Sequence, residues 1–269
     1  MPAERRHRRP RGLLLGIAAW SVFAFLMLPL LVVFPISVSS ASYLQFPPPG
    51  FSWQWFQRYW DDPAWIEATI RSLKVAALCT AIAMLLGVPL SFALVRSRLR
   101  IMRVMEQLVA TPIIVPHIIF SIAVYAVFAR MRLIGSWQGI ALAHAVLALP
   151  FVVILVSAGL RSFDEAQEQA AMGLGARWPT AVWRVTLPQI RPSLVSAGLL
   201  AFISSFDELV VAMFLSGASM TLPKKMFDNI MLEIDPTIAV VSVLQIILVA
   251  LCLGLMTAFG RGLAPSARH

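Results

Sequence analysis

Six long apolar runs, separated by polar segments, dominate the chain. Their approximate bounds are 12–38, 70–95, 108–129, 137–160, 193–216 and 238–259. Each run can form a helix that crosses about 30 Å of hydrocarbon, and within a bilayer only helices and closed barrels satisfy the backbone internally. The pattern predicts an all-α, polytopic membrane protein with six transmembrane helices. Residues 12–269 then form a single membrane domain behind a basic N-terminal segment, 1–11.

Prolines interrupt two of the predicted spans. Pro112 and Pro116 lie four residues apart in the third run, and Pro150 lies in the fourth. Because proline lacks an N–H and clashes with the preceding helical turn, we expect kinks in these two helices.

A polar and aromatic segment joins the first two runs. Ser52 is placed to cap a short helix that carries five rings, Trp53, Trp55, Phe56, Tyr59 and Trp60. Such rings favour the interface between membrane and water, so the segment is predicted to be an interfacial anchor. Contact with an extracytoplasmic partner is the alternative.

One long polar segment, residues 161–192, lies between the fourth and fifth runs. Ser162 and Glu165 have the spacing of a capping box, which predicts the start of a helix. The predicted helix is amphipathic. Its apolar stripe holds Phe163, Ala166, Ala170 and Leu174, and Asp164, Glu165 and Glu168 lie roughly opposite.

A bend and a second short helix are predicted to follow in the same segment. Gly175 is placed to end or bend the first helix. Pro179 lies early in the second helix, where its missing N–H costs little, and Pro188 is expected to stop it. The apolar side of the second helix is predicted to hold Trp178, Ala181, Val182 and Val185. An ordinary amphipathic connector remains the alternative for the whole segment.

The basic residues are distributed unevenly among the polar segments. The chain has 269 residues, 59% of them hydrophobic, and a net charge of +9. The predicted topology places 15 Lys and Arg on the side of both termini and the 161–192 loop, and 7 on the other side. The positive-inside rule then puts the termini and this loop in the cytoplasm. The cations sit in short clusters between apolar runs without a nucleic-acid motif, so a nucleic-acid partner is not expected. A cleaved signal peptide is the weaker reading of the first run.

An acidic pair, Asp207 and Glu208, lies inside the fifth apolar run. Ionisable side chains at membrane depth are costly unless they face protein or water, and they mark candidate sites. Together with Ser204 they are predicted to line a path for a cationic solute; ion pairing with a neighbouring helix is the equal alternative. His117 and His144 are interpreted as hydrogen-bonded packing groups.

No metal site or disulfide is predicted. Cys79 and Cys252 both lie in apolar runs, and neither histidine has a second ligand at a metal-binding spacing. We interpret the two cysteines as apolar fillers.

The 161–192 segment resembles the EAA loop of binding-protein-dependent ABC importer permeases. The matching positions are Gln169, Ala170, Ala171, Gly175, Val185, Leu187 and Pro188. Two positions depart from the family pattern, Gln169 where glutamate is usual and Val185 where isoleucine is common, while Glu168 keeps a carboxylate next to the first. The resemblance implies that these residues, with Glu168, couple the chain to an ATPase.

Other stretches resemble the polyamine branch of the same family, the second permease of spermidine/putrescine importers. They include residues 46–52, 142–153, 205–208 and 233–238. The resemblance implies a type I ABC importer permease fold in a bacterial inner membrane. It also implies four kinds of partner: a second homologous permease, two cytoplasmic ATPase subunits, a periplasmic solute-binding protein and the lipid bilayer. Opine and aminophosphonate permeases belong to the same branch and leave other solutes open.

No catalytic residue or bound cofactor is predicted for this chain. It lacks a phosphate-binding G-x-x-x-x-G-K-[ST] loop, so ATP and Mg would be bound by the partner ATPases. An intramembrane enzyme is the distant alternative, because no G-x-S-x-G or H-E-x-x-H motif is present. A passive channel remains a third class.

Overall fold

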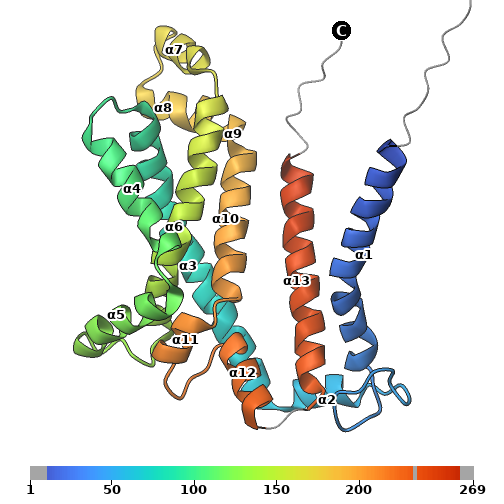
Figure 1. Cartoon of the computed structure of the whole chain (residues 1–269). Helices are drawn as coiled ribbons and strands as arrows, with labels where there is room; N and C mark the ends of the chain where they lie inside the picture. Colours follow the sequence, from blue (N-terminus) through green and yellow to red (C-terminus); the bar gives the residue numbers. More distant parts are fainter. Residues whose placement is uncertain (1–10, 233–234, 261–269) are drawn as a thin grey trace, which may run out of the picture. The chain divides into compact units, whose positions relative to one another are not determined.

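The computed structural model describes residues 11–232 and 235–260, and this part of the chain is almost entirely helical. Within these residues, Ser39 and Phe51 form an isolated antiparallel β-bridge. The helices are drawn in Figure 1. In chain order they are α1 (Arg11–Ser37), α2 (Gln54–Asp61), α3 (Pro63–Arg96), α4 (Ile101–Ile114), α5 (His117–Arg130), α6 (Trp137–Ser162), α7 (Glu165–Gly173), α8 (Trp178–Ala181), the π-helical turn η1 (Val182–Thr186), α9 (Leu187–Gln189), α10 (Arg191–Phe206), α11 (Val210–Leu215), α12 (Leu222–Leu232) and α13 (Thr237–Gly260).

Four helices in the described residues are long and apolar enough to cross a membrane, α1, α3, α6 and α13. A fifth span results if α4 and α5 are counted together. The fifth predicted run contains α10, which has 16 residues and is therefore about 24 Å long. All six apolar runs are helical, but only four of them are single long helices.

The chain divides into two compact units, which are described separately. The first consists of Met1–Asp62 and Asn229–Ile246, and the second of Pro63–Asp228 and Ile247–His269. In the first unit, the predicted aromatic helix is present as α2. Ser52 Oγ accepts a hydrogen bond from the Gln54 N–H, although Trp53 is the N-cap residue. The indole of Trp55 is buried and donates to the Ala41 carbonyl at 3.1 Å.

Small side chains let α3, α6 and α10 pack closely in the second unit. Their shared core contains Cys79 and Ala83 from α3, Ala148 from α6, and Ala197 and Ala201 from α10. Each of these residues is at most 1% exposed. Without a hydrophobic driving force between helices in lipid, such close backbone approach supplies the packing energy.

Two glycines mark the closest approaches within this core. A Cβ on Gly87 of α3 would lie 2.6 Å from Val152 of α6, and one on Gly159 of α6 would lie 2.4 Å from Ser193 of α10. Both distances are too short for a side chain. The three helices therefore form one tightly packed body.

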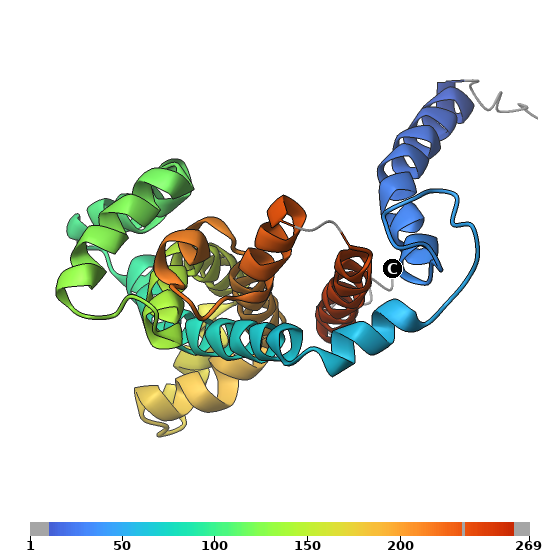
Figure 2. The ribbon, with the colours of Figure 1, turned by 90° about the horizontal axis from the view of Figure 1, so that it is seen from below.

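The third apolar run is not the single kinked helix that its pattern predicts. It forms α4 and α5, which meet at an angle of 105°, and Figure 2 shows α5 turning away from the direction of α4. Pro116 is the N-cap of α5, and Val115 before it is extended, with ψ of 127°. A residue that precedes proline is pushed out of the helical region by the proline ring, which explains the break. Pro150, in contrast, lies inside α6, which continues through it.

Helix α12 is an element that the hydrophobic pattern did not predict. Its first residue, Leu222, donates its backbone N–H to Ser72 Oγ of α3 at 2.7 Å. The Lys225 ammonium lies 4.7 Å from the centre of the Trp65 ring. These two contacts fix the start of α12 against the first turns of α3.

Candidate functional site

The fifth apolar run breaks at the acidic pair instead of continuing as one helix. Helix α10 ends at Phe206 and α11 begins at Val210. The Glu208 carboxylate accepts hydrogen bonds from the backbone N–H groups of Val210, Val211 and Ala212 at 3.1, 2.8 and 3.4 Å. It therefore satisfies N–H groups at the start of α11 that have no partner within that helix. The predicted continuous helix over 193–216 is wrong because this side chain caps a new one.

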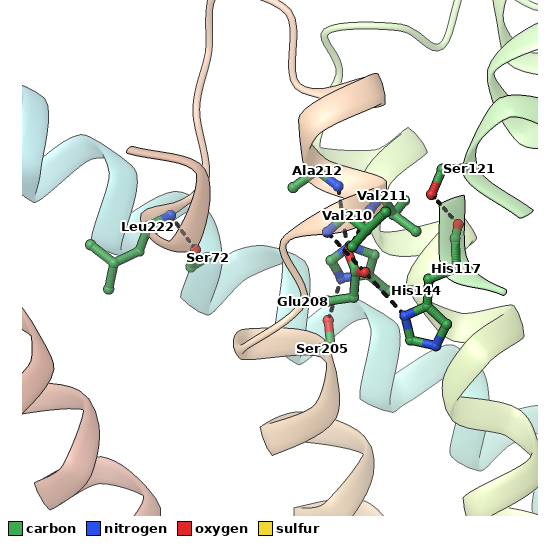
Figure 3. Close-up of polar contacts among 10 residues, drawn as sticks. All are labelled: Ser72, His117, Ser121, His144, Ser205, Glu208, Val210, Val211, Ala212 and Leu222. Atoms are coloured by element: carbon green, nitrogen blue, oxygen red, sulfur yellow. Dashed lines mark hydrogen bonds and ion pairs between the residues drawn. The ribbon is translucent and has the colours of Figure 1, made fainter. Parts of the chain in front are cut away.

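Two histidines from different helices face the same carboxylate, as Figure 3 shows. His144 Nε2 lies 3.4 Å from Glu208 Oε2, and His117 Nδ1 lies 3.6 Å from Glu208 Oε1. The other nitrogen of His144, Nδ1, lies 2.9 Å from Ser205 Oγ. His144 is 2% exposed and Glu208 is 8% exposed, whereas half of the His117 side chain is accessible. Helices α5, α6 and α10 thus meet at one polar cluster.

A cavity of about 410 Å³ opens beside this cluster. Its wall contains both histidines, Ser204, Asp207 and Glu208, and it also includes apolar residues such as Phe151 and Ile203. No lysine or arginine is among its lining residues. The wall therefore carries two carboxylates and no permanent positive charge.

The two adjacent carboxylates occupy different environments in this wall. Asp207 is exposed and Ser204 is half-buried, while Glu208 is buried and bound by backbone N–H groups. The structure brings together the three residues that the sequence suggested for a solute path, but it gives Glu208 a capping role. Ion pairing of Glu208 with a neighbouring helix was the other predicted alternative, and the side chains that face its carboxylate are histidines, which carry a charge only when protonated. Within residues 11–232 and 235–260, no group of three or more His, Cys, Asp or Glu side chains is arranged to hold a metal ion.

Sequence reasoning missed that His117 and His144 belong to this cluster. A signal was present for His144, since Leu147 and Phe151 follow it at helical spacing and line the same cavity. His117 could not be placed because its position depends on the sharp bend between α4 and α5. The two histidines were interpreted as packing groups, which fits buried His144 better than accessible His117.

The 161–192 loop lies at the other end of α10 from the cavity (Figure 1). Helix α7 ends as predicted near Gly175, which has a φ of +93°. Such a backbone conformation is readily adopted only by glycine. Helix α8 begins at Trp178 with Pro179 in its first turn, also as predicted. The second helix does not stop at Pro188, because η1 and α9 continue it to Gln189.

The start and the orientation of α7 differ from the prediction. Asp164 is the N-cap, and its carboxylate accepts from the Ala166 N–H at 3.0 Å. Ser162 Oγ instead donates to the Gly159 carbonyl, so no capping box forms. The predicted apolar stripe is largely exposed: Ala166 and Ala170 face outward, and Leu174 is 91% exposed. Of the predicted acidic side, Asp164 and Glu165 are exposed, and Glu168 alone faces inward.

The inward-facing residue of α7 is Glu168, which is 2% exposed. Its carboxylate accepts hydrogen bonds from both terminal nitrogens of Arg96, and the Arg96 Nη2 to Glu168 Oε2 distance is 2.8 Å. Thr186 of η1 donates its hydroxyl to the same carboxylate. Burial alone would raise the pKa of Glu168, but the hydrogen bonds from Arg96 and Thr186 and the Arg96 charge hold this pKa below its ordinary value. Glu168 is therefore a buried, ionised group.

The remaining predicted coupling residues divide into an exposed and a packed group. Gln169, Ala170 and Pro188 are exposed. Val185 and Leu187 are partly buried against the core of α3, α6 and α10. Trp178 and Trp183 add large apolar surfaces that are 51% and 73% exposed. The loop therefore presents an apolar outer surface on a base that is packed against the helices.

Comparison with known proteins places the chain in a family. The arrangement of apolar helices around a polar cavity defines a multi-pass membrane protein. The chain belongs to the family of binding-protein-dependent transport system inner membrane components, which it matches over residues 80–268. The similarity extends over most of the helices described above and includes both the cavity and the 161–192 loop. The chain is therefore a membrane component of a transport system, and not an enzyme.

Similar proteins include several with a stated transport system. The chain is 30% identical over 230 residues to the spermidine/putrescine transport system permease protein PotC of Haemophilus influenzae, covering 84% of this chain and 88% of that protein. It is 32% identical over 246 residues to the putrescine transport system permease protein PotI of Escherichia coli, covering 88% and 85%. It is also 33% identical over 224 residues to the molybdenum transport system permease protein ModB of Mycobacterium tuberculosis, covering 76% and 85%.

The fold is that of type I ABC importer permeases. A chain from the crystal structure of a bacterial ABC transporter that imports the acidic polysaccharide alginate superimposes with a TM-score of 0.74. The match covers 96% of this chain and 99% of that chain, at 21% sequence identity. This confirms the fold class that the sequence predicted.

Proposed function

We propose that this chain forms half of the translocation path for a small cationic solute, a polyamine such as putrescine or spermidine. The observation that carries this proposal is the cavity whose wall contains Asp207 and Glu208 but no lysine or arginine. A carboxylate in a partly desolvated path makes charge-assisted hydrogen bonds to an ammonium group, and these are stronger than neutral ones. The similarity to PotC and PotI supports the same class of solute.

The similarity to ModB raises an alternative, because molybdenum transport systems in general handle a different solute from polyamines. An oxyanion would approach two carboxylates in this cavity and meet no compensating cation among the lining residues. Repulsion between the oxyanion and the two carboxylates opposes binding, especially where water is partly excluded. The wall therefore favours a cation. An opine or aminophosphonate, which carries both signs of charge, remains the second candidate because the accessible imidazole of His117 lines the same cavity.

The 161–192 loop would couple this path to ATP hydrolysis in two partner ATPase subunits. Its exposed apolar side chains, Leu174, Trp178 and Trp183, form a surface of the kind that a groove in another protein covers. The residues assigned to coupling are Glu168, Gln169, Ala170, Ala171, Gly175, Val185, Leu187 and Pro188. ATP and Mg would be held by the ATPases, and this chain would contribute no catalytic group.

The other partners would be a second homologous permease and a periplasmic solute-binding protein. A solved relative of this fold is a bacterial alginate ABC transporter in complex with a pentasaccharide-bound periplasmic protein. Its chain matches with a TM-score of 0.63 at 13% identity, so this match supports a shared fold and nothing more. The chain would lie in the inner membrane with both termini and the 161–192 loop in the cytoplasm, in accord with the excess of Lys and Arg on that side.

The solute class can be tested with the complete transporter in proteoliposomes, supplied with its binding protein. We expect putrescine or spermidine to stimulate ATP hydrolysis and to accumulate inside the vesicles. Molybdate should do neither. Stimulation by molybdate alone would contradict the polyamine assignment, and accumulation without ATP would instead support a passive channel.

A further inference from the structure

Helix α7 is held against the rest of the chain by an acidic side chain. Among its nine residues, which the structure describes throughout, Glu168 alone is buried. The alanines on the opposite side, Ala166 and Ala170, are exposed and contribute no apolar anchor. Two exposed contacts supplement Glu168: Gln189 donates to Gln167, and Glu165 lies 3.9 Å from Arg96. The buried attachment of α7 is thus electrostatic.

The Glu168 carboxylate joins three elements of the second unit. Arg96 is the last residue of α3, Glu168 lies in the middle of α7, and Thr186 ends η1. Arg96 binds the carboxylate through both terminal nitrogens, and its guanidinium also lies 5.4 Å from the centre of the Phe92 ring in the same helix. Thr186 is fully buried and donates to the same oxygen as Arg96 Nη2. A two-pronged contact of this kind fixes orientation as well as distance.

Arg96 ends helix α3, which packs against α6 and α10. Residues of α3 belong to the core shared with α6 and α10, and Gly87 brings α3 against Val152 of α6 at its closest approach. Interfaces packed in this way shift between discrete arrangements rather than deform gradually. A displacement of α7 would therefore be passed to α3 as a rigid movement, provided that the contact between them does not yield.

We propose that Arg96, Glu168 and Thr186 form a joint that transmits movement of the 161–192 loop to helix α3. This inference rests on the proposed coupling of the loop to the ATPases, and it assigns Arg96 and Thr186 a positioning role that the loop's sequence resemblance does not contain. The buried carboxylate of this loop is Glu168, whereas Gln169, which stands where the family pattern has glutamate, is exposed. The joint acts within one chain, whereas the exposed surface of the loop acts between chains.

The joint can be tested by measuring solute uptake and ATP hydrolysis in the same proteoliposomes, with putrescine as the solute. Glu168→Gln keeps the volume of the side chain and removes its charge. We expect the number of putrescine molecules transported per ATP to fall at least about fivefold, the lower end of typical coupling effects, while ATP hydrolysis continues. Arg96→Lys keeps a positive charge but loses the two-pronged contact, so it should lower the same ratio to a smaller extent.

Two controls separate the joint from the fold and from docking. Glu106→Gln removes the carboxylate of an exposed ion pair with Arg161, 3.1 Å long, and should leave the ratio unchanged. Leu174→Cys provides an exposed site for cross-linking the loop to the ATPase. If the cross-link forms in both joint variants and their transport ratio equals that of the wild type, the joint is wrong. If Glu168→Gln does not assemble, a wild-type transport ratio in Arg96→Lys shows by itself that the joint is wrong. Failure of the cross-link in the otherwise wild-type transporter contradicts the proposed coupling surface itself.

Discussion

Asp207 and Glu208 are neighbours in sequence, yet their carboxylates lie in different environments. Glu208 is 8% exposed and accepts three backbone hydrogen bonds, so its charge is stabilised by dipoles that belong to the fold. Asp207 is exposed on the wall of the same cavity. A solute that approaches this wall would reach Asp207 without displacing the hydrogen bonds that hold α11 in place. The geometry therefore divides the pair into a group for solute contact and a group for support.

This division predicts different results for two conservative substitutions. Asp207→Asn should lower polyamine uptake severalfold, because a charge-assisted hydrogen bond is about twice as strong as a neutral one, and it should leave the amount of assembled complex unchanged. Glu208→Gln should lower thermal stability, since weakening a buried acceptor costs about 1–3 kcal/mol. Uptake normalised to assembled transporter, together with the unfolding temperature, distinguishes these effects.

Either of two results would overturn the division. Normal uptake by Asp207→Asn would remove that residue from the solute path. Reduced uptake by Glu208→Gln at unchanged stability would show that Glu208, despite its burial, contacts the solute.

The identity of these residues could be predicted from sequence, but their partners could not. An acidic pair in an apolar run is unusual enough to mark a candidate site, which is why the sequence pointed to Ser204, Asp207 and Glu208, three residues that line one cavity in the structure. The histidines that face Glu208 come from α5 and α6, at sequence distances that no local pattern spans. The burial of Glu168 was missed for the same reason, because its counter-charge is Arg96, 72 residues earlier.

At the scale of the element, breaks in helices decide where the functional groups point. Pro116 forces the bend that brings His117 to the cavity, and the Glu208 cap separates α11 from α10. The loop contains a third irregularity, the π-helical turn η1, which ends with Thr186 against Glu168. Turns of this type are frequent at functional sites. Apolar runs predicted where helices occur, but the irregular positions depended on hydrogen bonds that sequence periodicity does not report.

Gly175 offers a prediction at this scale, because it sits at the turn between α7 and α8. No atom lies within 4 Å of the position where a Cβ would be built, so lack of space does not require glycine at this position. The backbone conformation does, because φ is +93°. Gly175→Ala should strain the turn by about 1–2 kcal/mol and change the angle between the two short helices. We expect weaker assembly with the ATPase and a lower transport ratio, and a larger effect for Gly175→Asp.

Gly173 is the matched control for this turn. It is the last residue of α7, lacks a positive φ, and also has open space around its Cβ position. Gly173→Ala should therefore be neutral or stabilise the helix by up to about 1 kcal/mol. Equal losses of coupling in both variants would mean that the loop tolerates no side chain on this surface, and that the turn is not the cause. Normal coupling in Gly175→Asp would count against the coupling assignment.

At the scale of the whole molecule, one unit combines the cavity that we propose for the solute and the loop that we propose for coupling on a shared set of helices. Helix α10 begins beside the loop, at Arg191, and ends beside the cavity, at Phe206. It packs with α3 and α6 through alanine, serine and glycine, which allows backbones to approach closely. The fold class followed from the apolar runs and the loop pattern, and the solved relatives confirm it. The number of long spans did not follow, since two of the six runs are broken.

The orientation of the molecule in the membrane is the last prediction, and the coupling proposal depends on it. Positively charged segments stay on the cytoplasmic side during insertion, and 15 of the 22 Lys and Arg lie on the side assigned to both termini and the loop. A reporter fused after His269 should therefore be cytoplasmic, and one inserted near Asp62 should be external. Leu174→Cys, at a position that is 91% exposed in the loop, should react with a membrane-impermeant thiol reagent only after the cells are opened. The native cysteines, Cys79 and Cys252, are buried and give the background in the parent chain. Labelling of Leu174→Cys in intact cells would place the loop where no ATPase can reach it, and both the coupling surface and the joint at Glu168 would then be wrong.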